Sequence, residues 1–151
     1  RRIAMLLPMD GLGGKEGYKI SSLYFDDITD SMLADTLDGN PFREKYRIRI
    51  YNDSLSPVRL EVKRKKYNRA GKISSEITEE ELSALMSGRT ISDRNHPSDA
   101  RTLFNLAIKA RGLRPKIIVA YDRRAYVHEA GNVRITFDRK LRASSQWELF
   151  V

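Results

Sequence analysis

Hydrophobic and charged side chains alternate most regularly along residues 43–65, on either side of a polar segment at 52–57. With the two-residue period of a β-strand, each half places polar, mostly basic side chains on one face and apolar side chains on the other. The polar face carries Lys45, Arg47, Arg49 and Tyr51 in the first half and Arg59, Glu61, Lys63 and Lys65 in the second. The pattern therefore predicts a β-hairpin with a basic stripe along each strand.

Two hypotheses explain the basic stripes. Like charges directly opposite each other on neighbouring strands are destabilising, so many cations on one sheet face need a reason. In the first hypothesis, this face is the solvated outer face of a half-buried antiparallel sheet. In the second, it lines a cleft or barrel lumen that holds a polyanion, where arginines make bidentate contacts with phosphate and lysines supply point charges.

The remaining pattern predicts strands and helices on both sides of this hairpin. Before it we expect the end of a helix at 1–7, a glycine-rich linker at 11–17, a strand at 18–26 and a short helix that begins after Thr29 or Asp30 and ends at Leu37. After it we expect a turn at 68–71, an extended segment from Lys72 and a helix from the capping box at 78–81 to Gly88. A polar loop at 89–97 then leads to a helix from Ser98 to about Arg111. The rest of the pattern predicts strands at 116–128 and 132–138, a loop at 139–145 and a strand at 147–151.

The later strands decide between the two hypotheses. Each of them also has a partly polar face, which carries Tyr121, Arg123 and Ala125 in one strand and Arg134, Thr136 and Asp138 in the other. Cations at interior positions of four alternating strands favour the lumen over a face that simply meets water. We therefore predict an α+β fold with a closed or nearly closed antiparallel β-barrel, or tunnel, which has a cationic interior and flanking helices over its apolar outer faces.

Composition narrows the partner and the compartment. The 151 residues are enough for one domain with its own core, and 28 Lys and Arg against 20 Asp and Glu favour an anionic partner such as nucleic acid, a phosphorylated small molecule or a lipid headgroup. The absence of cysteine excludes disulfides and cysteine nucleophiles from these residues and is compatible with a reducing compartment. No apolar run approaches the roughly 20 residues of a membrane span, so we expect a cytoplasmic location and no span in this chain.

Other candidate chemistry has less support. His96 and His128 have no metal-binding spacing, and no serine stands in a nucleophile-elbow motif. The pair Asp26 and Asp27 could bind a cation, but a turn at the strand end followed by a helix cap is the favoured role.

Glu61 is the only carboxylate on the basic face of its strand. It is placed either to hold a divalent ion or to pair with Lys63 or Arg49. The sequence pattern leaves both roles open, with ion pairing slightly favoured.

Five motifs, in their order and separation, resemble the VTC domain of polyphosphate polymerases, within the CYTH or triphosphate tunnel superfamily. They are SLYFDD, KYRIRIY, LEVKRKK followed by GKISSE, YDRRAY and VRITFDR, and the resemblance runs from about residue 18 to 141. It implies an antiparallel tunnel lined by basic residues. It also implies an enzyme that moves the terminal phosphate of a nucleotide onto a growing polyphosphate chain with Mn²⁺ or Mg²⁺.

Carried over motif by motif, the resemblance implies a set of site residues. The expected catalytic residues are Arg47, Arg49, Lys63, Arg123 and Arg134. The expected phosphate ligands are Lys72 and Tyr121, to which the strand pattern adds Lys45. The expected metal ligand is Glu61. The family's opening strand and its closing strand, which carries a metal-binding glutamate, have no match here, and Glu148 does not fit that motif. We therefore expect a single tunnel domain over residues 1–151 that lacks its first and last strands.

The expected partners are a nucleoside triphosphate and inorganic polyphosphate, and no nucleic acid. The phosphate chain itself attacks, so this transfer requires no nucleophilic side chain. Two alternatives stay open, which are a triphosphatase with water as the acceptor and a polyanion-binding module without catalysis.

Overall fold

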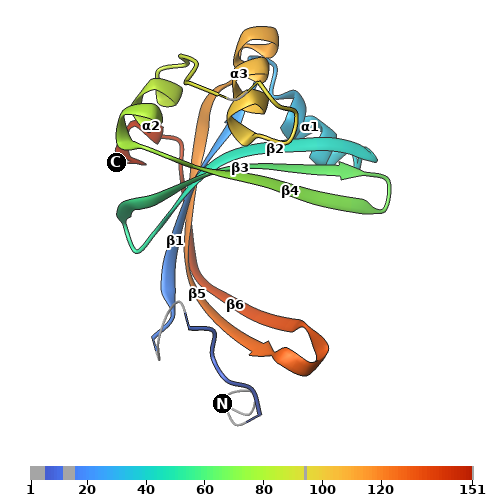
Figure 1. Cartoon of the computed structure of the whole chain (residues 1–151), viewed down its shortest axis with the longest axis vertical. Coiled ribbons are helices and arrows are strands. Elements are labelled where there is room, and N and C mark those ends of the chain that lie inside the picture. Colours follow the sequence, from blue (N-terminus) through green and yellow to red (C-terminus); the bar gives the residue numbers. More distant parts are fainter. Residues whose placement is uncertain (1–5, 12–15, 94, 151) are drawn as a thin grey trace.

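The computed structural model describes residues 6–11, 16–93 and 95–150, so the helix end predicted at 1–7 and the linker predicted at 11–17 fall largely outside them. Within these residues, six strands form one antiparallel sheet in the order β4-β3-β2-β1-β5-β6 (Figure 1). In chain order the elements are β1 (Tyr18–Asp26), α1 (Ser31–Leu37), β2 (Phe42–Tyr51), β3 (Ser54–Lys66), β4 (Arg69–Ile77), α2 (Glu79–Met86), α3 (Ala100–Arg111), β5 (Arg114–His128), η2 (Glu129–Gly131), β6 (Val133–Ser144) and η3 (Trp147–Phe150). The predicted α+β class with an antiparallel sheet is confirmed.

The predicted basic hairpin is formed by β2 and β3, but its turn is shorter than expected. Only Asn52 and Asp53 form the turn, and both have positive φ, at 52° and 54°. Asn and Asp tolerate this left-handed conformation better than most residues, which permits a two-residue turn. The polar segment predicted as a loop at 52–57 is therefore mostly strand, because β3 already begins at Ser54.

The helix ends largely follow the predicted capping signals. Thr78 and Glu81 form the reciprocal capping box at the start of α2. Gly112 ends α3 with φ 64°, as the sequence indicates. The start of α3 is shifted by one residue, because the carboxylate of Asp99, and not the hydroxyl of Ser98, accepts a backbone hydrogen bond from the first turn.

The C-terminal part of the described chain differs from its prediction. The expected loop at 139–145 is the second half of β6, which continues past a register shift near Lys140, a residue with φ 52°. The expected strand at 147–151 is replaced by the 3₁₀ turn η3. Phe150 is buried in the core, so packing of this side chain outweighs the strand pattern.

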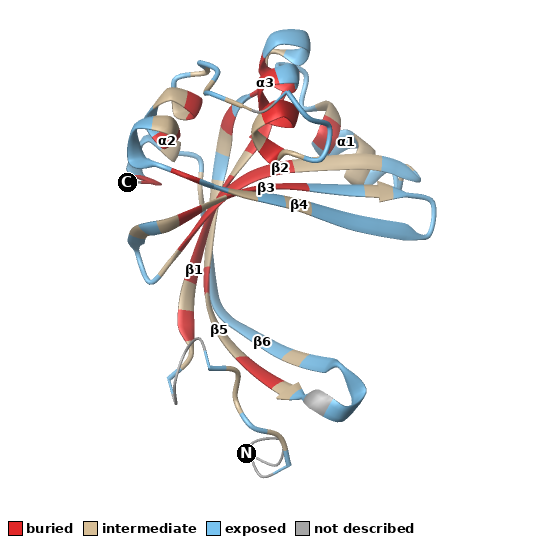
Figure 2. Ribbon diagram, viewed as in Figure 1, coloured by how far each residue is buried: buried red, intermediate tan, exposed pale blue. Residues whose placement is uncertain are grey.

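The core lies between the helices and one face of the sheet. Leu23, Ile48 and Leu60 form a fully buried row across β1, β2 and β3, on the face predicted to be apolar. Phe104 of α3 packs edge-to-face against Phe25 of β1, with ring centroids 5.3 Å apart. Figure 2 shows the buried residues concentrated where the central strands pass beneath the helices.

The sheet curves strongly but does not close. β1 lies in the middle, and β2–β4 and β5–β6 form two wings on either side of it (Figure 1). Within the described residues, β4 and β6 are edge strands, so the expectation of a closed or nearly closed barrel is wrong for this part of the chain. A barrel needs its outermost strands within hydrogen-bonding distance, whereas these two wings leave β1 in different directions.

Candidate anion-binding cleft

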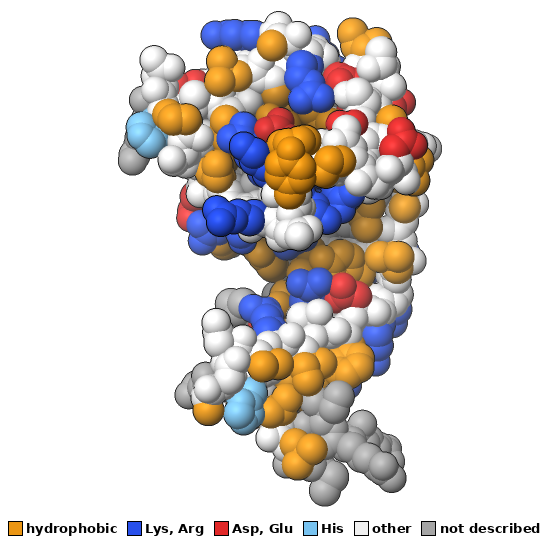
Figure 3. Space-filling model, turned by 90° about the vertical axis from the view of Figure 1, so that its right-hand side faces the viewer, with side chains coloured by type: hydrophobic (Ala, Val, Ile, Leu, Met, Phe, Trp, Pro, Cys, Tyr) orange, Lys and Arg blue, Asp and Glu red, His pale blue; other side chains and the backbone are white. Residues whose placement is uncertain are grey.

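The basic face of the sheet is turned away from the helices and lines a hollow between the two wings. The strand register places Glu61, Arg47 and Tyr24 side by side across β3, β2 and β1. Figure 3 shows this hollow with Lys and Arg side chains on both sides of it. Cations from separate strands thus converge, as the lumen hypothesis predicts, although the hollow is open on one side.

Three lysines stand directly opposite one another on the wing formed by β2, β3 and β4. Lys45 faces Lys63, and Lys63 faces Lys72. Side chains in such positions lie about 5 Å apart, so their like charges repel one another. Partial desolvation in the cleft, followed by the charges of Arg47 and Arg49, lowers the pKa of the exposed Lys63. This row is electrostatically unfavourable by itself, and a bound anion would relieve the repulsion.

Glu61 is the acid at the base of this basic row. Its side chain is 2% exposed, and its Oε2 accepts a hydrogen bond from Nε of Arg47 at 2.7 Å, while its Oε1 accepts one from Nζ of Lys72 at 3.1 Å. Burial alone would raise the pKa of Glu61, but the charges of Arg47 and Arg49 and these hydrogen bonds lower it overall. The sequence suggested Lys63 or Arg49 as the ion-pair partner of Glu61. Arg49 lies 3.9 Å from Oε2, and no ion pair within the described residues joins Lys63 to Glu61. The closer partners are Arg47 and Lys72.

A second polar group links β1, β2, β5 and β6. Arg49 donates to the Ser22 hydroxyl at 3.1 Å and to the Tyr121 hydroxyl at 3.5 Å. Arg123 also donates to the Tyr121 hydroxyl, at 3.3 Å, and forms a bidentate pair with Asp138 at 2.7 and 2.8 Å. The hydrogen bonds of this pair raise the pKa of Arg123 and lower that of Asp138. The predicted site residues Arg49 and Arg123 are thus joined through the predicted phosphate ligand Tyr121.

Arg134 lies on the β6 side of the hollow, beside the N-terminal segment. Its guanidinium donates to the Tyr18 hydroxyl at 2.8 Å and pairs with the carboxylate of Asp10. Burial, followed by the charge of Asp10, raises the pKa of Tyr18. The predicted site residues therefore form two groups, one centred on β2–β4 and the other on β5–β6, and Arg49 of β2 contacts residues of both.

The group on β2–β4 borders a cavity of about 450 Å³. Its lining comprises Tyr24, Ala70, Gly71 and the cationic residues Arg43, Lys45, Arg47, Lys63, Arg64, Lys65 and Lys72. Lys72 and Arg47 are held by Glu61, whereas Lys45 and Lys63 form no ion pair with an acid of the described residues. These two lysines are therefore available to an external anion.

Several lining residues were not among those predicted for the site. Tyr24, Arg43 and Lys65 share the strand face of the predicted residues, so the two-residue period could have indicated them. Arg64 has the opposite parity, and only the tertiary structure shows that it borders the cavity. Asp10 pairs with an arginine 124 positions away, a contact that no local pattern indicates.

The cleft offers a divalent ion only a partial ligand set. Among the described residues, no group of three or more His, Asp or Glu side chains could hold a metal ion. Both carboxylate oxygens of Glu61 accept hydrogen bonds from cationic side chains. The described residues thus do not by themselves fit a metal at Glu61, and its metal-binding role stays a prediction.

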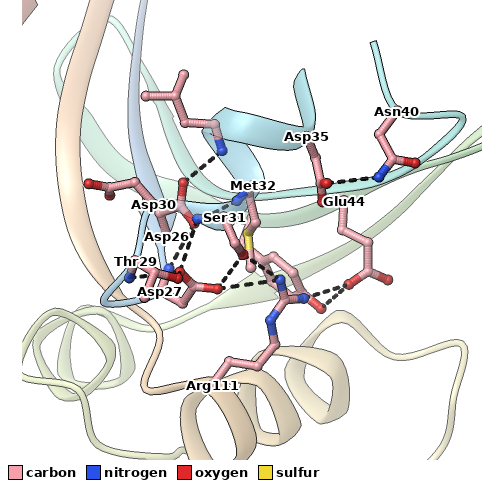
Figure 4. Close-up of polar contacts among 12 residues, drawn as sticks. Asp26, Asp27, Thr29, Asp30, Ser31, Met32, Asp35, Asn40, Glu44 and Arg111 are labelled. Atoms are coloured by element: carbon pink, nitrogen blue, oxygen red, sulfur yellow. Dashed lines mark hydrogen bonds and ion pairs between the residues drawn. The ribbon is translucent and has the colours of Figure 1, made fainter. Parts of the chain in front are cut away.

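The acidic pair at the end of β1 has the structural role favoured from the sequence, but the pair itself caps α1, and not the side chain of Asp30. Asp26 accepts hydrogen bonds from two backbone N–H groups of the first turn of this helix, which begins after Asp30 (Figure 4). Asp27 accepts hydrogen bonds from the backbone and the hydroxyl of Ser31 and lies 3.5 Å from the guanidinium of Arg111. The hydrogen bonds from Ser31 hold the pKa of Asp27 well below its usual range.

A curved antiparallel sheet with helices on its apolar face and clustered arginines and lysines on the other defines an α+β domain with a cationic candidate site. The family model of the VTC domain matches residues 1–150, so the chain belongs to the VTC domain family, whose function is related to polyphosphate. A search of curated proteins finds no significant match. None of the helices in the described residues is both long and apolar enough to cross a membrane.

Proposed function

We propose that this chain is a polyphosphate polymerase, which transfers the terminal phosphate of a nucleoside triphosphate onto a polyphosphate chain in the basic cleft. The observation that carries the proposal is the row of Lys45, Lys63 and Lys72 beside Arg47 on a cavity of about 450 Å³. Several phosphates in series require cations at successive positions, and a row across three strands supplies them. Membership of the VTC domain family supports polyphosphate as the ligand.

In the proposed reaction, a terminal oxygen of the acceptor chain forms a bond to the γ-phosphorus of the nucleotide. The bond between this phosphorus and the oxygen that bridges it to the β-phosphate breaks, and the nucleoside diphosphate leaves with the electron pair. Such a transfer mainly requires alignment of the phosphates and neutralisation of their charge. The residues proposed to supply both are Arg47, Arg49, Lys63, Arg123 and Arg134, with Lys45, Lys72 and Tyr121.

Dependence on Mn²⁺ or Mg²⁺ and a cytoplasmic location are part of this proposal. Among the described residues no carboxylate lines the cavity, and Glu61 is already paired with the lining residues Arg47 and Lys72, so the steps above are assigned to the chain's own basic side chains. The metal dependence is tested by treating the protein with a chelator, adding back Mn²⁺ or Mg²⁺ separately, and measuring conversion of ATP to polyphosphate.

The variant Lys63→Met tests the proposal without disturbing a buried pair. Lys63 is exposed, forms no ion pair among the described residues and is repelled by its neighbours, so we expect an unchanged or higher Tm. We also expect conversion of ATP to polyphosphate to fall about tenfold or more, since contacts with charged groups are stronger than neutral hydrogen bonds. The control is Lys109→Met, which removes the same charge from the exposed surface of α3. Equal turnover in both variants would refute the assignment of Lys63.

A triphosphatase is the second candidate, and the open side of the hollow favours it because water can reach the cleft (Figure 3). With water as the acceptor, the same cations would bind the triphosphate, but the product would be free phosphate. Gel analysis of the products, with a parallel phosphate assay, separates the two reactions. Long polymers identify the polymerase, and phosphate release without polymers identifies the hydrolase.

A further inference from the structure

Tyr24 lies on the central strand β1 and lines the basic cavity. It stands directly opposite Arg47 of β2, and the guanidinium carbon of Arg47 lies 5.9 Å from the centroid of its half-buried ring. The position of the Tyr24 hydroxyl is thus fixed by strand pairing and by packing of the ring, and not by a loop.

The Tyr24 hydroxyl accepts a hydrogen bond from Nη1 of Arg47 at 3.1 Å. A guanidinium has only donors, so this bond uses a lone pair of the hydroxyl and leaves the hydroxyl proton free for donation. Among the described residues no acceptor takes this proton, and the nearby lysine Lys63 is also only a donor. The proton is therefore available to an acceptor that enters the cavity.

We infer that Tyr24 is a phosphate-binding residue, whose hydroxyl donates a hydrogen bond to a non-bridging oxygen of the phosphate held by Arg47. This inference rests on the proposed function. A phosphate oxygen can accept from the guanidinium and the hydroxyl together, and hydrogen bonds to charged oxygens are the stronger ones. Tyr121 repeats the arrangement on β5, because its hydroxyl accepts from Arg49 and Arg123, and no acceptor within the described part of the chain takes its proton.

The variant Tyr24→Phe tests this inference, because it removes the hydroxyl and keeps the ring beside Arg47. Inorganic tripolyphosphate is the probe, and its Kd is measured by calorimetry for the wild type, Tyr24→Phe and the control Tyr67→Phe, which alters an exposed tyrosine in the β3–β4 turn. We expect Tyr24→Phe to raise Kd about tenfold at an unchanged Tm, and Tyr67→Phe to leave Kd unchanged.

Tyrosine labelled with ¹³C at Cζ supplies the second measurement. The NMR signal missing in Tyr24→Phe identifies Tyr24, and we expect this signal to shift in the wild type as tripolyphosphate is added. A Kd within twofold of the wild type would overturn the inference alone, whereas a wild type that does not bind tripolyphosphate would overturn the proposed function and this inference together. If Tyr24→Phe has a higher Kd but the Tyr24 signal of the wild type does not shift on addition of tripolyphosphate, Tyr24 only positions Arg47. This result would contradict direct contact of the hydroxyl with phosphate.

Discussion

At the scale of single residues, the carboxylate of Glu61 offsets the repulsion between cations on the basic face of the sheet. The side chain is almost completely buried and holds Arg47 on one oxygen and Lys72 on the other. Removal of one partner from a buried ion pair leaves the other charges uncompensated, and this usually costs more than the pair itself contributes. Glu61 is therefore a structural counter-ion for the cations of the candidate site.

We expect Glu61→Gln to lower the free energy of unfolding by about 3 kcal/mol, because the buried guanidinium of Arg47 loses its counter-charge. Urea unfolding measures this change. The control is Glu76→Gln, which breaks an exposed pair with Arg59 at 3.4 Å and is expected to cost less than about 1 kcal/mol. Equal costs for the two variants would contradict the counter-ion role.

At the scale of elements, the connection between β1 and α1 depends on carboxylates rather than on an ordinary N-cap. Asp30 precedes the helix in a left-handed conformation and its side chain makes no capping bond. Asp26 and Asp27 accept the N–H groups of the first turn instead. The negative charge at this position also interacts favourably with the positive end of the helix dipole.

This arrangement predicts a pH-dependent contribution to stability. The pKa of Asp27 is lowered in the folded chain, so the contribution of Asp27 is fully present above its ordinary pKa of about 4 and is lost as the pH falls further. We expect Asp27→Asn to destabilise the protein by about 1 kcal/mol at pH 7, and this difference from the wild type to shrink below about pH 4.

Thermal unfolding of the wild type and Asp27→Asn between pH 3 and pH 7 measures this difference. The control is Asp38→Asn at the other end of α1, where the side chain is exposed. A difference between wild type and Asp27→Asn that is constant over this pH range would contradict the role of the ionised carboxylate.

At the scale of the whole molecule, the two wings bring basic residues from the five strands β2 to β6 to one hollow. The charge of Arg49 on β2 adds to the effect of Arg123 in lowering the pKa of Asp138 on β6, although β1 and β5 separate β2 from β6 in the sheet. Curvature of the sheet therefore concentrates positive potential, and a net charge of +8 adds to it.

We expect the affinity for tripolyphosphate to fall steeply with salt, because several cations contribute and exposed charges are screened over about 10 Å at 0.1 M salt. Calorimetry at several KCl concentrations measures the dependence. Lys63→Met is expected to show a shallower dependence than the wild type, and Lys109→Met the same dependence as the wild type. An affinity that does not change with salt would contradict binding by clustered charges.

The strands at 18–26 and 43–51 could be predicted, as could the faces of the side chains in the second, because alternation is a property of each strand alone. The continuation of β6 past residue 138 could not, since it depends on pairing with β5 across a register shift. Of the candidate site, Arg47, Arg49, Lys63 and Arg123 could be placed on one face in advance, but of their polar partners only the pairing of Glu61 with Arg49 was predicted.

The sequence by itself determined which side chains share the basic face of the sheet, because the two-residue period of a strand is built into the backbone. Only the tertiary structure decided that Glu61 holds Arg47 and Lys72, that the Tyr24 hydroxyl meets Arg47, and that the described sheet stays open. These features depend on register, twist and the paths of the two wings, which arise from contacts between residues far apart in the chain.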